Sequence, residues 1–301
     1  MRIERRKSRE RGNFLGLALT IAVLGVQPAG AQGGTDVYAA TLTVRGSSIS
    51  VGRPRNITRR TGYDNQPAFT ADGSAILFTS IQEDAQADIW RVAFDGGMAA
   101  RLTGGPESEY SATPTPDGKG YTTIRVERDS TQRLWRFPWD QTAPSVVLPA
   151  LMPVGYHVWV GEGAIGAFVL GRPNALVLAD PRTERVDTLA RNIGRAFARV
   201  WGRDAFTFAQ LAGDTVWISE VDVRTRAVRR LMQAPAGGEY HFWTRDGQCI
   251  ATSGTRLYRW IDGRWDVLAD FAELGVKSVT RLAVSPAGDR IAFVAEDGGV
   301  P

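Results

Sequence analysis

The stretch NQPAFTADGSAILFTSIQEDAQADIWRVAFDGGMAARLT, residues 65–103, carries the pattern that decides the fold. Two β-rich runs flank Asp72-Gly73, and an Asp-Gly pair between apolar runs is a strong hairpin signal because both residues tolerate positive φ. A third run covers residues 87–94, and a short fourth run ends at Thr103. The stretch therefore predicts four consecutive strands joined by turns.

This unit repeats along the chain. The hairpin turns recur at Asp72, Asp117, Glu162, Arg203, Asp246 and Ala287, with spacings of 45, 45, 41, 43 and 41 residues. Valine, isoleucine, threonine and aromatic residues dominate the runs, and no helical period intervenes. Four strands in about 42 residues is the period of a β-propeller blade.

The count of units predicts how the ring closes. Five units are complete, but the sixth, which begins near Lys277, offers only a hairpin. Residues 36–44 match the third-strand pattern and residues 55–58 match the fourth. We therefore expect an all-β, six-bladed β-propeller of four-stranded blades. Residues 32–301 would form this single domain, with blade six built from residues 277–301 plus 36–59, so that no sheet edge stays open.

The N-terminal segment indicates export. Residues 1–13 are strongly basic, residues 14–26 are apolar, and Ala29-Gly30-Ala31 is a small-residue cleavage frame. This is the pattern of a secretory signal peptide cleaved after Ala31. The apolar run is too short for a permanent membrane span. We expect a periplasmic or secreted protein without a transmembrane segment in the mature chain, and the sequence leaves open whether export follows the general or the twin-arginine route.

The charge balance excludes one class of partner. The signal segment holds six basic and two acidic residues, so the remaining chain has 30 of each. A net charge of zero gives no reason to expect nucleic acid as a partner. The one cysteine, Cys249, lies in an apolar run and is interpreted as a core residue, so no intramolecular disulfide is possible. We expect a monomer that is stabilised by its core.

Both histidines lie in one motif, YHVW at residues 156–159 and YHFW at residues 240–243. Each histidine precedes its hairpin turn by five residues, so the pair repeats one position on the inner strands of blades three and five. We interpret them as packing residues between blades. A channel-lining binding role and a shared catalytic or metal site remain alternatives.

Other motifs carry no cofactor prediction. GEGAIG, residues 161–166, satisfies the dinucleotide-binding spacing but leads into a strand rather than a helix, so it offers no helix N-terminus to a phosphate. No Cys-x-x-Cys or His-Glu-x-x-His pattern supplies zinc ligands. We therefore expect no cofactor and no metal.

The first repeat resembles a known family. Pro67, Phe69, Asp72-Gly73, the Asp88-Ile89-Trp90 strand and the closing Arg101-Leu102-Thr103 are similar to the WD-like repeats of the TolB propeller family. The resemblance implies a six-bladed propeller that binds a protein of the bacterial cell envelope. TolB pairs its propeller with an N-terminal α/β domain, for which the sequence here shows no counterpart.

Loops predict where a partner would bind. We expect tight turns on one face and longer loops, such as residues 59–66 and 104–110, on the other, around the mouth of the central channel. The candidate binding residues there are Tyr63, Asp64, Asn65, Glu109, Tyr110, Tyr156, His157, Tyr240 and His241.

Three functions fit these residues. The favoured one is a non-enzymatic, TolB-like binding module for a protein or peptide of the cell envelope. The alternatives are a propeller that binds a small ligand or glycan, and a metal-dependent enzyme of the lactonase or lyase type.

Overall fold

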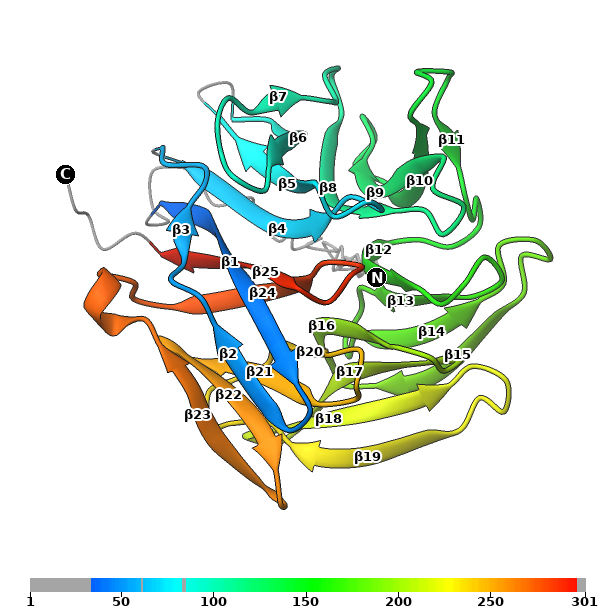
Figure 1. Ribbon diagram of the computed structural model, residues 1–301. Coiled ribbons are helices and arrows are strands. Elements are labelled where there is room, and N and C mark those ends of the chain that lie inside the picture. Colours follow the sequence, from blue (N-terminus) through cyan, green and yellow to red (C-terminus); the bar gives the residue numbers. More distant parts are fainter. Residues whose placement is uncertain (1–33, 61, 83–84, 297–301) are drawn as a thin grey trace, which may run out of the picture.

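The computed structural model describes residues 34–60, 62–82 and 85–296. Its sheets are arranged around a central axis, with one strand of each blade nearest that axis (Figure 1). The only helical element among these residues is the short 3-10 turn η1 (Ala272–Leu274). The expected fold class, an all-β propeller of four-stranded blades, is confirmed.

In blades one to five the strands follow one another in sequence from the inner strand to the outer one. Blade one contains β4 (Tyr63–Phe69), β5 (Ala75–Ile81), β6 (Ala87–Ala93) and β7 (Ala100–Arg101). Blade two contains β8 (Ser108–Pro114), β9 (Gly120–Val126), β10 (Gln132–Pro138) and β11 (Ser145–Val146). Blade three contains β12 (Val154–Trp159), β13 (Ile165–Val169), β14 (Ala175–Ala179) and β15 (Val186–Arg191). Blade four contains β16 (Ile193–Val200), β17 (Ala205–Ala212), β18 (Thr215–Asp222) and β19 (Val228–Gln233). Blade five contains β20 (His241–Trp243), β21 (Cys249–Ser253), β22 (Arg256–Ile261) and β23 (Arg264–Asp270).

Blade six joins the two ends of the described chain. Its inner hairpin is β24 (Val279–Val284) and β25 (Arg290–Glu296), and its outer strands are β1 (Thr35–Arg45) and β3 (Arg55–Asn56). β1 pairs antiparallel with β25 from Thr35↔Glu296 to Thr41↔Arg290, and β3 pairs with β1. The last blade is thus closed by N-terminal strands. The expected signal peptide, residues 1–31, lies outside the described residues.

The N-terminal strands also extend beyond blade six, which the sequence pattern did not predict. The far half of β1 turns at Gly46 and pairs with β2 (Ser48–Val51). This hairpin lies against blade five, where Gln248 donates to the carbonyl of Gly46 and Arg259 donates to the carbonyl of Ser47. The N-terminal segment therefore contacts two blades.

The hydrophobic core is divided among the contacts between blades. Six clusters of buried residues lie one at each of the six junctions between neighbouring blades. At the junction of blades one and two, for example, Leu77 and Ile89 pack against Tyr121 and Phe137. Each sheet is therefore apolar on both faces, and each blade needs a neighbour on each side.

The hairpin turns of blades one, two and five share one hydrogen-bonding arrangement. In blade one the hydroxyl of Thr70 and the backbone N–H of Ser74 donate to the Asp72 carboxylate, and Gly73 has a φ of 70°. The hydroxyls of Thr70 and Ser74 lower the pKa of Asp72 to about 2. The same threonine–aspartate contact recurs in blades two and five, which explains why Asp-Gly marked the repeats.

Loop length does not separate the two faces as expected from the sequence. The turn between β4 and β5 spans residues 70–74, whereas on the opposite face β17 and β18 are joined by Gly213 and Asp214 alone. Long connections on that opposite face are confined to some blades, such as residues 147–153 between blades two and three. Loop length therefore does not identify the binding face.

Closure of the ring should be essential for stability. A chain beginning at Gly62 lacks β1 and therefore exposes apolar surface of blades five, six and one. In the complete ring, Val37 and Leu42 of β1 cover part of this surface and are only 0% and 3% exposed. Burial of each such side chain contributes about 1.5–3 kcal/mol to the free energy of unfolding, which is only about 5–15 kcal/mol for a whole domain. We expect this chain to aggregate or to melt far below one that begins at Gln32, as measured by calorimetry and gel filtration.

A peptide of residues 32–60 added to the shortened chain should restore part of the lost stability, because β1 and β3 then pair in trans. A monomeric Gly62 chain with the melting temperature of the longer chain would contradict this closure.

Candidate functional site

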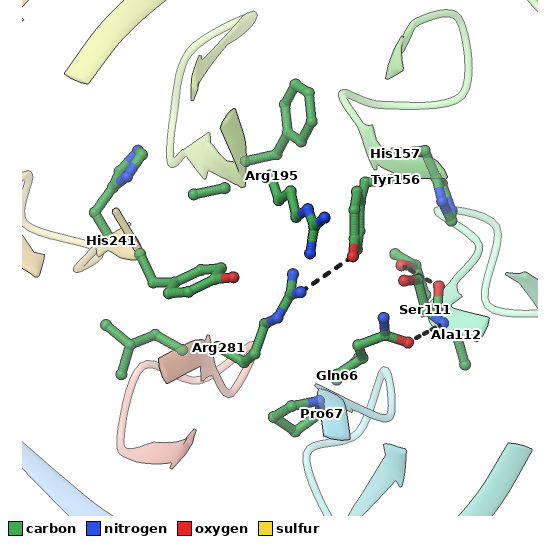
Figure 2. A pocket seen from close by; sticks show the side chains of 15 residues that line it. Gln66, Pro67, Ser111, Ala112, Tyr156, His157, Arg195, His241 and Arg281 are labelled. Atoms are coloured by element: carbon green, nitrogen blue, oxygen red, sulfur yellow. Dashed lines mark hydrogen bonds between the residues drawn. The ribbon is translucent and has the colours of Figure 1, made fainter. Parts of the chain in front are cut away.

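The central channel holds a cavity of about 120 Å³ that is lined from all six blades. One side chain per blade, from the inner strand or just before it, supplies most of its polar character (Figure 2). In blade order these residues are Gln66, Ser111, Tyr156, Arg195, Tyr240 and Arg281. We call them the channel ring, and the channel mouth is the end at which the six inner strands begin.

Bulges in the inner strands place several ring residues. At Gln66, Ser111 and Arg281 the pairing with the next strand shifts register, and the three residues have φ values of 57°, 55° and 52°. Positive φ is uncommon for residues other than glycine. A β-bulge re-aims a side chain from the sheet face, and such bulges are frequent beside functional sites. Three blades thus hold an unfavourable backbone conformation at the channel.

Arg281 lies half-buried within the channel between two tyrosine rings. Its guanidinium carbon is 4.9 Å from the ring centre of Tyr156 and 4.7 Å from that of Tyr240. One guanidinium nitrogen donates to the Tyr156 hydroxyl at 3.0 Å, which Figure 2 marks. Burial acts to lower the pKa of Arg281, but the neighbouring tyrosines outweigh it and the pKa is raised. The channel therefore carries a fixed positive charge that two aromatic faces stabilise.

Arg195 adds a second positive charge. Its side chain also lines the cavity and extends toward the same central space as Arg281 in Figure 2. Its backbone N–H donates to the carboxylate of Glu239. No acidic side chain is among those that line the cavity in the described part of the chain. The electrostatic character of this site is therefore basic.

The candidate binding residues identified from the sequence did not include Arg195 or Arg281. The sequence did contain a signal. The position seven residues before each hairpin turn is expected at the start of an inner strand. Arg195 and Arg281 lie next to this position, which Ala196 and Thr280 occupy. The alignment does not show the bulges, which decide whether that neighbouring side chain enters the channel.

Four of the predicted residues are tyrosines close to this charge. Tyr156 and Tyr240 line the cavity. Tyr63 and Tyr110 lie close enough to interact electrostatically with the Tyr156 hydroxyl. Burial raises the pKa of Tyr240 to about 12, and it raises the pKa values of Tyr63 and Tyr110 as well. Tyr63, Tyr110 and Tyr240 therefore stay neutral at physiological pH.

Two predicted carboxylates are buried in ion pairs instead of facing the channel mouth. Asp64 is 1% exposed and lies 2.5 Å from Arg60, and Glu109 is 2% exposed and lies 2.8 Å from Arg125. Asn65 is buried too, and its side-chain oxygen accepts from the backbone N–H of Gln66 at the bulge. These three side chains therefore interact with other groups of the protein, at the inner strands of blades one and two.

The two histidines form matching contacts between blades. His157 Nε2 lies 2.7 Å from the Thr122 hydroxyl of blade two, and Trp159 donates to that same hydroxyl. In blades four and five, His241 Nε2 lies 2.8 Å from the Thr207 hydroxyl, which also accepts from Trp243. The recurring Tyr-His-x-Trp motif therefore joins blade three to blade two and blade five to blade four. This is consistent with packing between blades.

Both imidazoles are neutral. His241 Nδ1 lies 3.3 Å from the Glu239 carbonyl, which can only accept, so Nδ1 carries the proton and Nε2 accepts from Thr207. Burial lowers the pKa of His157 to about 3 and that of His241 to about 4. Both residues touch the cavity wall, but their rings extend away from its centre (Figure 2).

The remaining motifs have structural explanations. Residues 161–166 form the turn into β13 and no helix follows. Cys249 is buried, and burial raises the pKa of its thiol. Within the described ranges no group of three or more His, Cys, Asp or Glu residues is placed to hold a metal ion. The described segments also contain no helix with the length and hydrophobicity needed to span a membrane.

Comparison with known proteins supports the fold. No family model matches the chain, and no curated protein sequence matches it. Among solved structures, a protein from Agrobacterium tumefaciens that is assigned as a TolB superposes with a TM-score of 0.66 at 15% identity, over 87% of this chain and 98% of that one. TolB from Acinetobacter baumannii gives 0.52 at 16% identity, over 65% and 51% of the two chains.

A gluconolactonase from Xanthomonas campestris gives a TM-score of 0.62 at 12% identity, over 90% of this chain and 99% of that one. These likenesses define the class of the protein, a β-propeller with a TolB-like fold. At such low identity they show the fold alone.

The histidines should make stability depend on pH. The folded pKa values of about 3 and about 4 lie below the ordinary value of 6.5, so the unfolded chain binds protons first. Stability is then fully present above pH 6.5 and is lost as the pH falls toward the folded values. The expected loss is up to about 1.4 kcal/mol per histidine for each pH unit, measured by urea unfolding between pH 7.5 and 5.

The double variant His157→Gln, His241→Gln removes every histidine of the chain. It should be less stable at pH 7.5 but should show a much flatter dependence between pH 6.5 and 5. An unchanged slope would show that other groups cause the effect.

The shared threonine can be tested separately. Thr207→Val keeps the shape of the side chain but leaves the buried groups of His241 and Trp243 without their common partner. We expect a loss of about 1–3 kcal/mol in unfolding free energy. Thr215→Val on the neighbouring strand is the control, because Thr215 makes no side-chain hydrogen bond in the described structure; it should change stability by under about 0.5 kcal/mol. Equal effects would contradict the contact.

Proposed function

We propose that this protein is a TolB-like binding propeller that holds a protein or peptide of the cell envelope at its channel mouth. The observation that carries the proposal is the channel ring, in which two arginines and two tyrosines from different blades converge on one cavity. Tyrosine and arginine are the residue types enriched where proteins bind one another. A rigid scaffold that presents them needs little ordering on binding.

The size of the cavity favours a large partner over a small one. Pockets that enclose small molecules usually measure about 300–1,000 Å³, whereas the channel cavity measures about 120 Å³. It accommodates one side chain or chain end, so most of a ligand would lie outside it, across the mouth. This argues against a free glycan or metabolite enclosed in the channel.

The charge of the channel argues against the metal-dependent enzyme. Divalent cations are held by carboxylate and carbonyl oxygens, but the channel ring presents the guanidinium groups of Arg195 and Arg281, which repel a cation. The nearest predicted carboxylates, Asp64 and Glu109, are engaged with arginines of their own blades. The likeness to a gluconolactonase is one of fold, so it keeps this alternative open without favouring it.

The cell-envelope assignment rests on two observations. The first repeat resembles the TolB repeat, and the fold superposes on two structures assigned to TolB. The N-terminal pattern of a signal peptide adds an exported location, where a TolB-like propeller would meet its partner.

Site-specific photo-crosslinking tests the choice of face. A photoreactive residue at Arg128, whose side chain is 76% exposed in the β9–β10 connection on the same face as the channel mouth, should form an adduct with an envelope protein in intact cells. One at Trp139, 37% exposed on the opposite face, should not. Tyr156→Ala and Tyr240→Ala should weaken the Arg128 adduct about tenfold or more, since such residues act as binding hot spots.

Asp95→Ala and Asp140→Ala, in turns on the opposite face, serve as controls and should leave the adduct unchanged. An adduct formed only from Trp139, or none from either position, would contradict the proposed function.

A further inference from the structure

Arg281 differs from Arg60, Arg125 and Arg133, three other partly buried arginines, in having no carboxylate partner within the described residues. Arg60, Arg125 and Arg133 pair with Asp64, Glu109 and Glu127 at 2.5 to 2.8 Å. The only side-chain hydrogen bond of Arg281 within the described residues goes to the neutral hydroxyl of Tyr156. A guanidinium has five N–H donors, and a charge removed from water is stable only when it is paired. The channel thus holds donor capacity that the fold does not use.

The backbone at this position supports a functional explanation. Arg281 has a φ of 52°, and the bulge that contains it turns the guanidinium into the channel. Residues other than glycine rarely adopt this conformation, because it is sterically unfavourable for them. Tyr156 and Tyr240 contact both sides of the guanidinium and restrict its orientation. The group is therefore held in place before any ligand arrives.

Arg195 makes the same space attractive to a single anion. Its side chain enters the cavity from blade four, whereas Arg281 enters from blade six. The carboxylate of Glu239 accepts from the backbone of Arg195, and Glu239 is not among the residues that line the cavity. Two guanidinium groups in one cavity with no carboxylate in its described wall repel each other, and an anion between them would remove this repulsion.

We propose that the channel binds a carboxylate of the partner peptide, either its C-terminal group or an acidic side chain, between Arg281 and Arg195. The planar guanidinium of Arg281 donates two parallel hydrogen bonds to the two carboxylate oxygens. The cavity of about 120 Å³ admits this group, and the rest of the peptide lies over the tyrosines. This inference rests on the proposed function and names the chemistry that its site recognises.

Short peptides of defined charge test the proposal on the chain beginning at Gln32. The probes are acetyl-Ala-Ala-Ala with a free carboxylate, the same peptide as its amide, and the amides of acetyl-Ala-Glu-Ala and acetyl-Ala-Gln-Ala. Inorganic phosphate is a fifth probe. Binding is followed by the NMR signals of the arginine Nε–H groups, and circular dichroism checks the fold of each variant.

At least one acid should bind about tenfold or more tightly than its matched amide, because a charge-assisted pair is lost in the amide. Arg281→Gln should abolish this preference, and Arg281→Lys should retain part of it, since the charge remains without the planar fork. Arg182→Gln removes an exposed arginine that pairs with Glu162 near the opposite face, and it should leave the preference intact. If Arg281→Gln does not fold, Arg195→Gln and Arg281→Lys carry the same test.

The two acids separate the sources of the carboxylate. Preference for the free C-terminus identifies a chain end, and preference for the glutamate peptide identifies a side chain. Equal binding of acids and amides, a preference that survives Arg281→Gln, tighter binding of phosphate, or no binding at tens of millimolar would overturn the proposal. The Arg128 crosslink distinguishes the proposed function from the carboxylate site. An adduct that persists in Arg281→Gln would contradict the carboxylate site but not the partner site at the channel mouth.

Discussion

The structure depends on the burial of both faces of every sheet. No blade has a core of its own, because the apolar side chains lie in six clusters between neighbouring blades. A linear stack of such sheets would leave two apolar faces exposed, and only a closed ring leaves none. The need to close explains why β1 crosses to blade six and why its hairpin with β2 also covers blade five. It also fixes the inner strands around one axis, and that geometry creates the channel.

Several polar side chains of the channel come from positions where the regular strand pairing of the repeat is interrupted. Most positions of the inner strands pair regularly with the second strand, and their side chains pack between blades. At Gln66, Ser111 and Arg281 the pairing breaks, and the side chain enters the channel. The regular part of each blade thus stabilises the ring, while the irregular residue forms part of the cavity wall. Adjacent residues can differ completely in role, as Tyr156 and His157 show.

The sequence was sufficient to predict the fold because the repeat is local. Asp-Gly turns and alternating apolar runs specify each hairpin, and the incomplete sixth unit indicates where the N-terminal strands must pair. The site was only partly predictable. Tyr156 and Tyr240 were identified from their places at the strand starts, but Asp64 and Glu109 proved to be buried in ion pairs. Arg195 and Arg281 lie at irregularities in strand pairing, and the repeat pattern in the sequence gives no sign of them.

The pairing of β1 with β25 has a consequence for the time course of folding. Blades one to five each use consecutive strands, so each can form as soon as its own residues are available. β1 is made first, yet its partner strand is made last. Until β25 has been made, the edge of β1 that pairs with it has no partner, and contacts between such distant segments form slowly. The ring therefore closes only after β25 has been made, so a chain that ends before β25 has five blades without a closed circle.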